Sequence, residues 1–179
     1  MFSRFGKITL ISLYILVVAA CKSQASHVAS LGDTKLEINW CPDDGTCDVK
    51  MLSNKSLIFK TDEFGIGYTE LISGESDLVI LEYVRNEIPN TADGHYIERV
   101  YFELPKNNEL LNLHNEKLQE INLLFERLCY CKGQTGFYKI TDGHFILEQI
   151  SPTKFHFRLD FNIGDVPHIL NHFDQMIQR

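Results

Sequence analysis

The sequence lacks the short motifs that identify the common enzyme classes. It contains no Gly-x-Ser-x-Gly elbow, no His-Glu-x-x-His helix, no phosphate-binding loop and no dinucleotide-binding glycine fingerprint. It also has no run of lysines and arginines, and its formal net charge is −7. Nucleic-acid binders usually carry a basic patch or stripe. That class is therefore excluded, and the enzymes that a sequence reveals most readily are disfavoured.

The apolar stretch at the N-terminus is too short to span a bilayer. It runs from Ile8 to Ala20 and follows the basic residues Arg4 and Lys7, whereas a transmembrane helix needs about 20 apolar residues. A charged start followed by a short apolar run is typical of a secretory signal. We therefore expect residues 1–20 to be a signal peptide. Loss of its two basic residues takes the net charge from −7 to −9.

The expected signal ends with Val18-Ala19-Ala20-Cys21, which resembles the lipobox of bacterial lipoproteins. The resemblance covers only the leader. It implies cleavage before Cys21 and a covalent diacylglycerol and acyl lipid on that cysteine. Cleavage by an ordinary signal peptidase and retention as an uncleaved anchor are the alternatives. Cysteine parity favours lipidation, because it leaves four of the five cysteines, an even number, in an oxidising compartment.

Residues 21–32 are small and polar and are expected to form a lipidated tether. Its maximum reach, about 35 Å when extended, would keep the protein close to its membrane. The cysteine is followed by Lys22 and Ser23 rather than by aspartate. By resemblance to enteric-type lipoprotein sorting, the expected location is the cell envelope, at the outer membrane. The acidic body is repelled by anionic lipids, so we expect the lipid anchor to hold the protein there.

Residues 33–179 have the length of a single domain. Strict alternation at Lys154–Phe161 predicts a half-buried strand. With residues 145–149 and 136–140 it should form a three-stranded antiparallel meander through the Asp142-Gly143 and Ser151-Pro152-Thr153 turns. Further strands are expected at residues 35–41, 47–52, 56–59, 67–72, 78–85 and 96–104.

Two stretches have the 3.6-residue spacing of amphipathic helices. One helix is expected between residues 110 and 128, and a second after Pro167. The predicted fold class is therefore α+β, an antiparallel sheet with a long helix and a C-terminal helix packed on one face. The apolar positions are Leu110, Leu111, His114, Leu118, Ile121, Leu124, Phe125 and Leu128 in the first, and Val166, Ile169, Leu170, Phe173, Met176 and Ile177 in the second.

Cys41, Cys47, Cys129 and Cys131 are candidates for two disulfides. Local pairing would close Cys129 to Cys131 over a single residue, a strained spacing that eases reduction. Crosswise bridges would each close a long loop and stabilise the fold by about 4–5 kcal/mol, and we favour them slightly. A redox pair or a four-thiolate metal site is the alternative. A helix C-terminus before Cys129 would oppose a redox thiolate.

His168 and His172 lie four residues apart and would share one side of the predicted C-terminal helix. Asp165, one turn earlier, could complete a zinc or copper site. Two histidines without a fixed third ligand form a weak motif, so these side chains are more simply interpreted as polar residues at the edge of an apolar stripe. No other metal or cofactor is expected.

Two further clusters are better explained by structure than by catalysis. His114 lies on the apolar face of the predicted long helix and is expected to be a core histidine. Asp43, Asp44 and Glu37 near Trp40 would suit glycosidase chemistry only if two carboxyls faced each other across a cleft. Acids in a Pro-Asp-Asp-Gly turn are ordinarily solvated. No catalytic residue is therefore assigned.

These features together predict a membrane-anchored envelope protein without enzymatic activity. Its domain would bind another protein, or a small apolar ligand, through a surface that the sequence does not identify. The alternative function is a periplasmic metal-binding or thiol-redox factor that uses His168 and His172 or the four cysteines. A hydrolase whose site is assembled from distant residues remains a third hypothesis.

Overall fold

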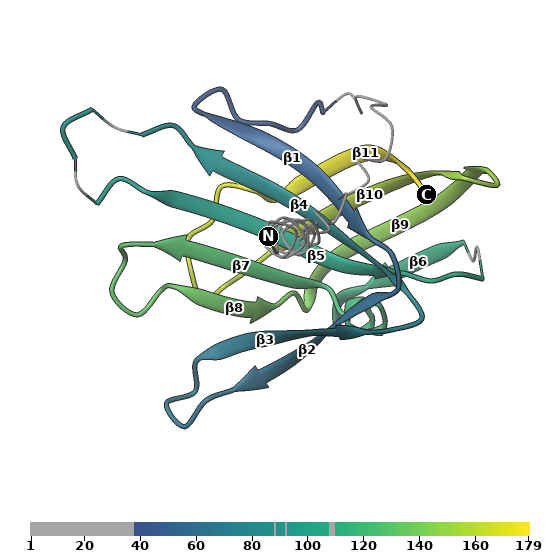
Figure 1. Cartoon of the computed structure of the whole chain (residues 1–179), viewed down its shortest axis with the longest axis horizontal. Helices are drawn as coiled ribbons and strands as arrows, with labels where there is room; N and C mark the ends of the chain where they lie inside the picture. The colour runs from purple at the N-terminus through teal and green to yellow at the C-terminus, as the bar shows by residue number, and fades with distance from the viewer. Residues whose placement is uncertain (1–37, 88, 92, 108–109) are drawn as a thin grey trace, which may run out of the picture. The chain divides into compact units, whose positions relative to one another are not determined.

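A computed structural model describes residues 38–87, 89–91, 93–107 and 110–179, and this part of the chain is built from β-strands (Figure 1). It contains eleven strands and one short 3₁₀ helix, η1 (Asn115–Ile121). The strands are β1 (Gly45–Leu52), β2 (Lys55–Thr61), β3 (Gly67–Ser73), β4 (Asp77–Arg85), β5 (Tyr96–Leu104), β6 (Leu111–His114), β7 (Leu124–Cys129), β8 (Gly136–Lys139), β9 (Asp142–Ser151), β10 (Lys154–Asn162) and β11 (His172–Gln178).

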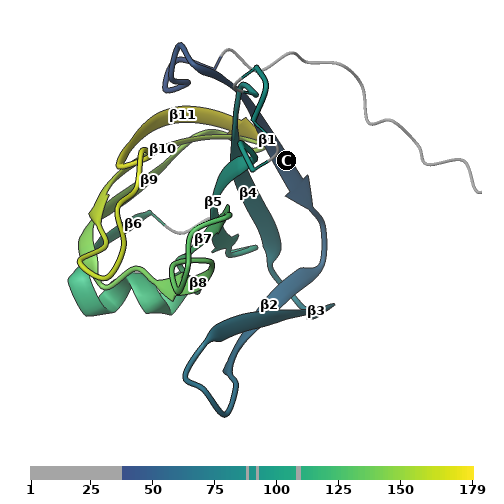
Figure 2. The ribbon, with the colours of Figure 1, turned by 90° about the vertical axis from the view of Figure 1, so that its left-hand side faces the viewer.

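The strands form three antiparallel sheets. A five-stranded sheet has the order β1-β4-β5-β7-β8, and a four-stranded sheet has the order β11-β10-β9-β6. These two sheets face each other, while the third sheet, the β2–β3 hairpin, projects beyond them (Figure 2). We call the side of the five-stranded sheet that faces the four-stranded sheet its inner face, and the opposite side its outer face.

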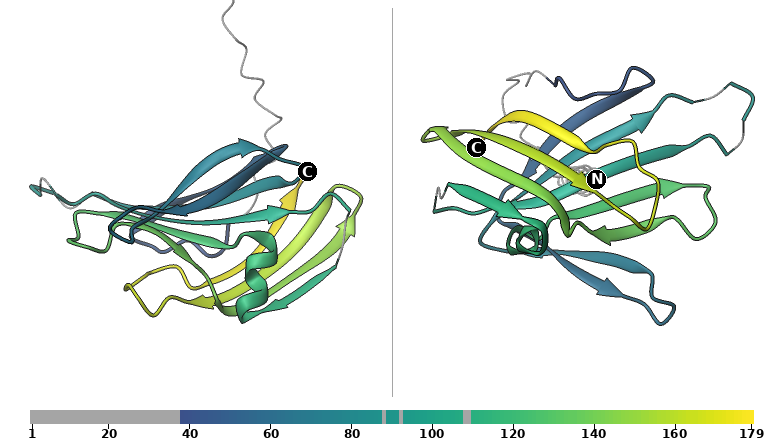
Figure 3. Two further views of the ribbon diagram at one scale, coloured as in Figure 1. Left: turned by 90° about the horizontal axis from the view of Figure 1, so that it is seen from below. Right: turned by 180° about the vertical axis from the view of Figure 1, so that it is seen from behind.

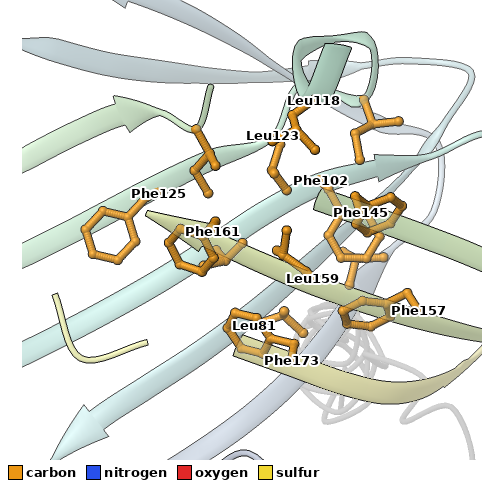
Figure 4. Packing of buried hydrophobic residues seen from close by; sticks show 14 of the residues in the cluster. Leu81, Phe102, Leu118, Leu123, Phe125, Phe145, Phe157, Leu159, Phe161 and Phe173 are labelled. Carbon is orange, nitrogen blue, oxygen red and sulfur yellow. The ribbon is translucent and has the colours of Figure 1, made fainter. Parts of the chain in front are cut away.

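The main hydrophobic core fills the space between the two larger sheets. Phe102 of β5 contacts the rings of Phe145 and Phe157 from the opposite sheet, with centroids 5.1 and 5.0 Å apart. Phe125 of β7 meets Phe161 of β10 in the same way at 6.1 Å (Figure 4). Each fully buried phenylalanine contributes about 1.5–3 kcal/mol relative to an exposed one. Strand alternation directs these rings inward, as the pattern of residues 154–161 predicted.

The predicted long helix between residues 110 and 128 is wrong. The segment forms β6, η1 and β7, and η1 is the short coiled ribbon in Figure 3. Asn115 and Asn122, which bound η1, have left-handed φ angles of 51° and 48°, a conformation that interrupts an α-helix. The apolar residues of the predicted helix are therefore divided among three separate elements. Their 3.6-residue spacing does not correspond to a helix.

The predicted C-terminal helix is also wrong, because residues 172–178 form strand β11. Every second side chain of β11 is buried, and those between are partly or fully exposed. The alternation was hidden in the sequence by Gln175, a polar residue that is only 2 % exposed. Its side-chain oxygen accepts a hydrogen bond from Trp40 Nε1 at 3.1 Å, and its amide nitrogen donates to the Met176 carbonyl at 2.8 Å. The fold is thus mainly β rather than α+β.

Two smaller expectations also change. Residues 38–41 of the expected first strand are not in a strand. The expected meander is divided between the sheets: β9 pairs with β10 as expected, but β8 pairs with β7 in the five-stranded sheet and not with β9. The expected signal peptide, the predicted lipidation site Cys21 and the expected tether lie outside the described residues, as does Glu37.

Candidate functional site

Exposed apolar side chains are concentrated on the β2–β3 hairpin. Phe64 at its tip is 80 % exposed. The other exposed large hydrophobic residues of the described chain lie singly in loops or on other strands, as is normal for a protein surface. A cluster of this kind on one projecting element is typical of an interaction surface. We call these residues the apolar hairpin surface: Ile58, Phe64, Ile66, Tyr68 and Leu71.

The hairpin tip is held in one conformation by Asp62. The Asp62 carboxylate oxygen Oδ1 accepts the backbone N–H groups of Phe64 and Ile66 at 2.9 and 2.7 Å. The Asp62 N–H donates to the Ile66 carbonyl at 3.0 Å, and Gly65 provides the positive φ of 83° that the turn requires. The backbone around Phe64 is thereby ordered before any partner arrives, which lowers the entropy cost of binding.

The side of the hairpin nearest the main sheet is fixed by its own small core. Leu57 and Phe59 pack there on the outer face of the five-stranded sheet. The Glu103 carboxylate accepts hydrogen bonds from Ser56 Oγ at 3.2 Å and from the Leu57 N–H at 3.1 Å. The hairpin is therefore anchored at its base. Its partners on the sheet are Leu52, Leu78, Ile80, Tyr101, Leu124 and Phe137.

An ion pair crosses the exposed side of the hairpin. Lys60 of β2 bonds to Glu70 of β3, and this hydrogen bond raises the pKa of Lys60. Both partners are exposed to solvent, where such pairs contribute little to stability. In the strand register Glu70 is opposite Ile58 and Lys60 is opposite Tyr68, so this ion pair lies on the same face as these two apolar residues.

A groove of about 580 Å³ lies between the hairpin tip and β8, the edge strand of the five-stranded sheet. At its closed end Gly67 approaches β8 so closely that an added Cβ would stand 2.3 Å from the Phe137 carbonyl oxygen. Only glycine permits this approach. The groove is lined by Phe59, Phe64, Gly65, Ile66, Gly67, Gly133, Thr135, Gly136, Phe137, Tyr138, Lys139, Thr141 and Asp165.

The groove has the size and lining typical of a ligand-binding pocket. Its volume lies within the range of about 300–1,000 Å³ typical of ligand pockets, and its lining is largely aromatic and glycine. Burial raises the pKa of Tyr138, so its phenol stays neutral. Lys139 lies over the Phe59 ring at 5.2 Å and, with Asp165, supplies the charges of the lining. The residues that line it include no histidine or cysteine.

The cysteines pair locally, as Cys41–Cys47 and Cys129–Cys131. The slightly favoured crosswise pairing is not what the structure contains. The first bridge closes the turn before β1, and the second lies at the end of β7, on the side of the five-stranded sheet away from β1. Two disulfides were expected in either case.

The structure separates the three candidate metal ligands at the C-terminus. His168 Nε2 accepts the Ile163 N–H at 3.1 Å and Nδ1 bonds to the Leu170 carbonyl at 2.7 Å, so both ring nitrogens are bound to backbone. His172 Nδ1 bonds to the Asp160 carboxylate of the neighbouring strand at 2.6 Å. Asp165 lines the groove beside β8. The i, i+4 relationship of the histidines depended on a helix that does not form.

The remaining candidates lie at the surface. His114 is exposed on β6 and stacks on His144, with ring centroids 3.8 Å apart, so it is not a core residue. Asp44 accepts a hydrogen bond from the Tyr83 hydroxyl at 2.7 Å, and Asp43 is exposed in the same turn. Among the residues that the structure describes, no three His, Cys, Asp or Glu side chains are grouped so as to hold a metal ion.

The sequence did not point to the apolar hairpin surface. The one feature of the sequence that could have indicated this surface is the pair of apolar residues Phe64 and Ile66 in a turn between Asp62 and Gly67, where polar residues are usual. Two exposed apolar side chains beside turn-forming residues could have identified a projecting tip.

The chain matches no protein-family model, no curated protein and no solved structure. Within the described residues, no helix combines the length and hydropathy needed to cross a membrane.

Proposed function

We propose that this chain is a lipid-anchored envelope protein without enzymatic activity that binds a partner protein. The binding site is the apolar hairpin surface together with the groove beside β8. The observation that supports the proposal most directly is the ordered tip, which keeps Phe64 in solvent although it is apolar. Aromatic side chains on ordered turns are characteristic anchors of protein interfaces.

A protein partner fits this surface better than a small apolar ligand does. A small ligand in the groove would contact Phe64 and Ile66 but would leave Tyr68 and the rest of the apolar hairpin surface in water, because these residues do not line the groove. A protein surface could cover the groove and the tip together. The exposed Lys60–Glu70 pair on the same face would supply polar contacts within that interface.

The anchor part of the proposal rests on Cys21 and its lipobox resemblance. We expect metabolic labelling to place an acyl lipid on the full-length chain, and Cys21→Ser to abolish it and release the protein from the outer-membrane fraction. Equal membrane retention of the unlabelled variant would contradict lipid anchoring.

The binding site is tested by site-specific photo-cross-linking in cells. A benzoylphenylalanine residue at position 64 should give one adduct of defined mass, whereas the same probe at Ile150 should not. Ile150 is a suitable control because it is 58 % exposed but lies on β9, away from the hairpin. The partner is then identified by mass spectrometry and purified.

Affinity measurements with that partner complete the test. Phe64→Ala should weaken binding about tenfold or more, in line with an anchor residue worth about 2 kcal/mol, while Ile150→Ala should leave Kd within about twofold. Circular dichroism should show that both variants are folded. Absence of a position-specific adduct, or equal Kd values for the two variants, would refute the site.

A further inference from the structure

The loop between β7 and β8 contains a disulfide that closes over one residue. Cys129 is the last residue of β7, Cys131 lies in the loop, and the intervening Tyr130 is 85 % exposed. Both cysteines are partly accessible to solvent. Disulfides closed over so short a span are generally easier to reduce than bridges with ordinary spacing.

The loop has hydrogen bonds that do not depend on the sulfur–sulfur bond. The Thr135 hydroxyl donates to the Cys129 carbonyl at 2.6 Å, and the Gln134 N–H donates to the Cys131 carbonyl at 3.1 Å. Arg127 Nη1 donates to the Gln134 side-chain oxygen at 2.6 Å. These bonds would hold the loop in place after reduction, so the two thiols would remain close enough to re-form the bridge.

Thr135 is placed to donate a hydrogen bond to Cys129 Sγ. The Thr135 hydroxyl lies 3.8 Å from Cys129 Sγ, and rotation about one bond turns its proton from the carbonyl toward the sulfur. Arg127 lies two residues earlier on the same face of β7, where its guanidinium bonds to the Tyr96 hydroxyl and to the Gln134 side-chain oxygen. Cys129 ends a strand and not a helix, so no helix dipole opposes a thiolate at this position.

The two cysteines differ in their packing against the core. Cys129 packs against the hydrophobic core, whereas Cys131 lies beyond the strand, next to the exposed Tyr130. The same loop contributes Gly133 and Thr135 to the lining of the groove. Cys131 is two residues before Gly133 in the chain, so a partner protein docked over the groove would also lie against this loop.

We propose that Cys129–Cys131 is a thiol–disulfide exchange site that accepts two electrons from the dithiol of a partner protein. Docking of that partner in the groove rests on the proposed function, whereas the reactivity of the disulfide does not. The Cys41–Cys47 bridge is structural and takes no part in the exchange.

The exchange proceeds in two displacements. A thiolate of the partner attacks Cys131 Sγ; the bond to Cys129 Sγ breaks and its electron pair leaves on Cys129, which receives a hydrogen bond from Thr135 and then a proton. The partner's second thiolate attacks the partner sulfur of the mixed disulfide, and Cys131 leaves with the electron pair and is protonated. The partner dithiol is oxidised to a disulfide, and Cys129 and Cys131 are reduced to thiols.

The test compares the two disulfides within one molecule, using dithiothreitol as the dithiol. The full-length oxidised chain is exposed to it under native conditions, quenched with a maleimide at intervals, digested and analysed by mass spectrometry. We expect Cys129–Cys131 to open at least tenfold faster than Cys41–Cys47. A smaller ratio, or the reverse order, overturns the proposal. Because no docking is involved, this failure is distinguishable from failure of the binding site.

A matched pair of variants tests the direction of attack. In Cys129→Ser the remaining thiol is Cys131, and in Cys131→Ser it is Cys129. With oxidised glutathione, Cys131 should form the mixed disulfide at least threefold faster than Cys129, because it lies outside the core. Equal or reversed rates would overturn the assigned route. The wild-type comparison requires no substitution, so the proposal is testable even if a variant fails to fold.

Discussion

The carboxylate of Glu98 accepts the backbone N–H of Leu170 at 2.7 Å, although 72 residues separate the two in sequence. Glu98 lies on the inner face of β5 and is fully buried. It also accepts the N–H of Ile169 at 2.8 Å and the hydroxyl of Tyr96. A single acidic side chain thus joins the segment before β11 to the five-stranded sheet and satisfies two backbone donors at that end of the core.

Removal of this carboxylate should be costly. Glu98→Gln keeps one acceptor but loses the charge, and should lower the free energy of unfolding by about 2–3 kcal/mol, since hydrogen bonds to charged groups contribute about 1.5–3 kcal/mol. Glu98→Ala should cost more, because both N–H groups lose their acceptor. Urea unfolding at pH 7 measures both. Glu120→Gln, at an exposed site, should change stability by about 0.5 kcal/mol or less. A similarly small change in the Glu98 variants would contradict the assigned role.

Acid should weaken an ion ladder on the outer face of the five-stranded sheet. Arg99 bonds to Glu82 on one side and to Glu126 on the other, at 2.9 Å for the second pair, and Lys50 bonds to Glu82 at 3.2 Å. Burial alone would raise the pKa of Glu82, but hydrogen bonds from Arg99 and Lys50 outweigh it and lower the pKa below its ordinary value of 4.5.

Because the folded pKa of Glu82 is lowered, its stabilising effect is present above pH 4.5 and is lost as the pH falls through the folded pKa. Each unit of lowering corresponds to about 1.4 kcal/mol. Unfolding free energies measured from neutral pH down through this range should therefore fall more steeply in the wild type than in Glu82→Gln. Parallel curves for the two proteins would show that the ladder does not contribute.

Local disulfide pairing gives a prediction that crosswise pairing does not. In the double variant Cys41→Ala, Cys47→Ala, the Cys129–Cys131 bridge should remain intact. The free energy of unfolding should fall by about 2 kcal/mol, as expected for a short closed loop in the chain-entropy model. Peptide mapping without reduction measures the pairing. Free thiols at Cys129 and Cys131 in this variant, or a loss near the 4–5 kcal/mol of a long loop, would contradict it.

The sequence predicted best those strands that have one buried and one solvated face. Residues 154–161 form β10 because Phe155, Phe157 and Phe161 alternate with polar neighbours, and this pattern needs no knowledge of the partner strand. Such a strand is specified locally, since only one register buries the aromatic side chains.

The strand β7 could not be recognised in this way, because both of its faces are covered. Phe125 lies in the main core, while Leu124 lies under the β2–β3 hairpin on the other side. Its sequence, Leu-Phe-Glu-Arg-Leu-Cys, has the buried charged residues Glu126 and Arg127 between apolar ones, so neither strict alternation nor a continuous apolar run marks it as a strand. The hairpin that creates the second buried face is more than fifty residues away in sequence.

The candidate site depended on the same long-range contact. The groove exists only because Gly67 of β3 lies against Phe137 of β8. The sequence of neither strand by itself predicts this contact. The cysteines were identified from sequence, but their pairing was not, because it depends on which strand ends are neighbours in space.

The contact between β3 and β8 can be tested by substituting each of two glycines with alanine. In Gly67→Ala, the new Cβ would stand 2.3 Å from the Phe137 carbonyl oxygen and 2.8 Å from the Phe59 ring, so β3 must move away from β8. Such overpacking costs about 1–3 kcal/mol, and hydrogen exchange should accelerate in β3 while β10 and β11 stay protected. Gly164→Ala is the matched control, because nothing lies within 4 Å of its added Cβ. It should leave stability and exchange nearly unchanged. If the two variants behave alike, β3 does not depend on this close approach and the groove has no fixed wall.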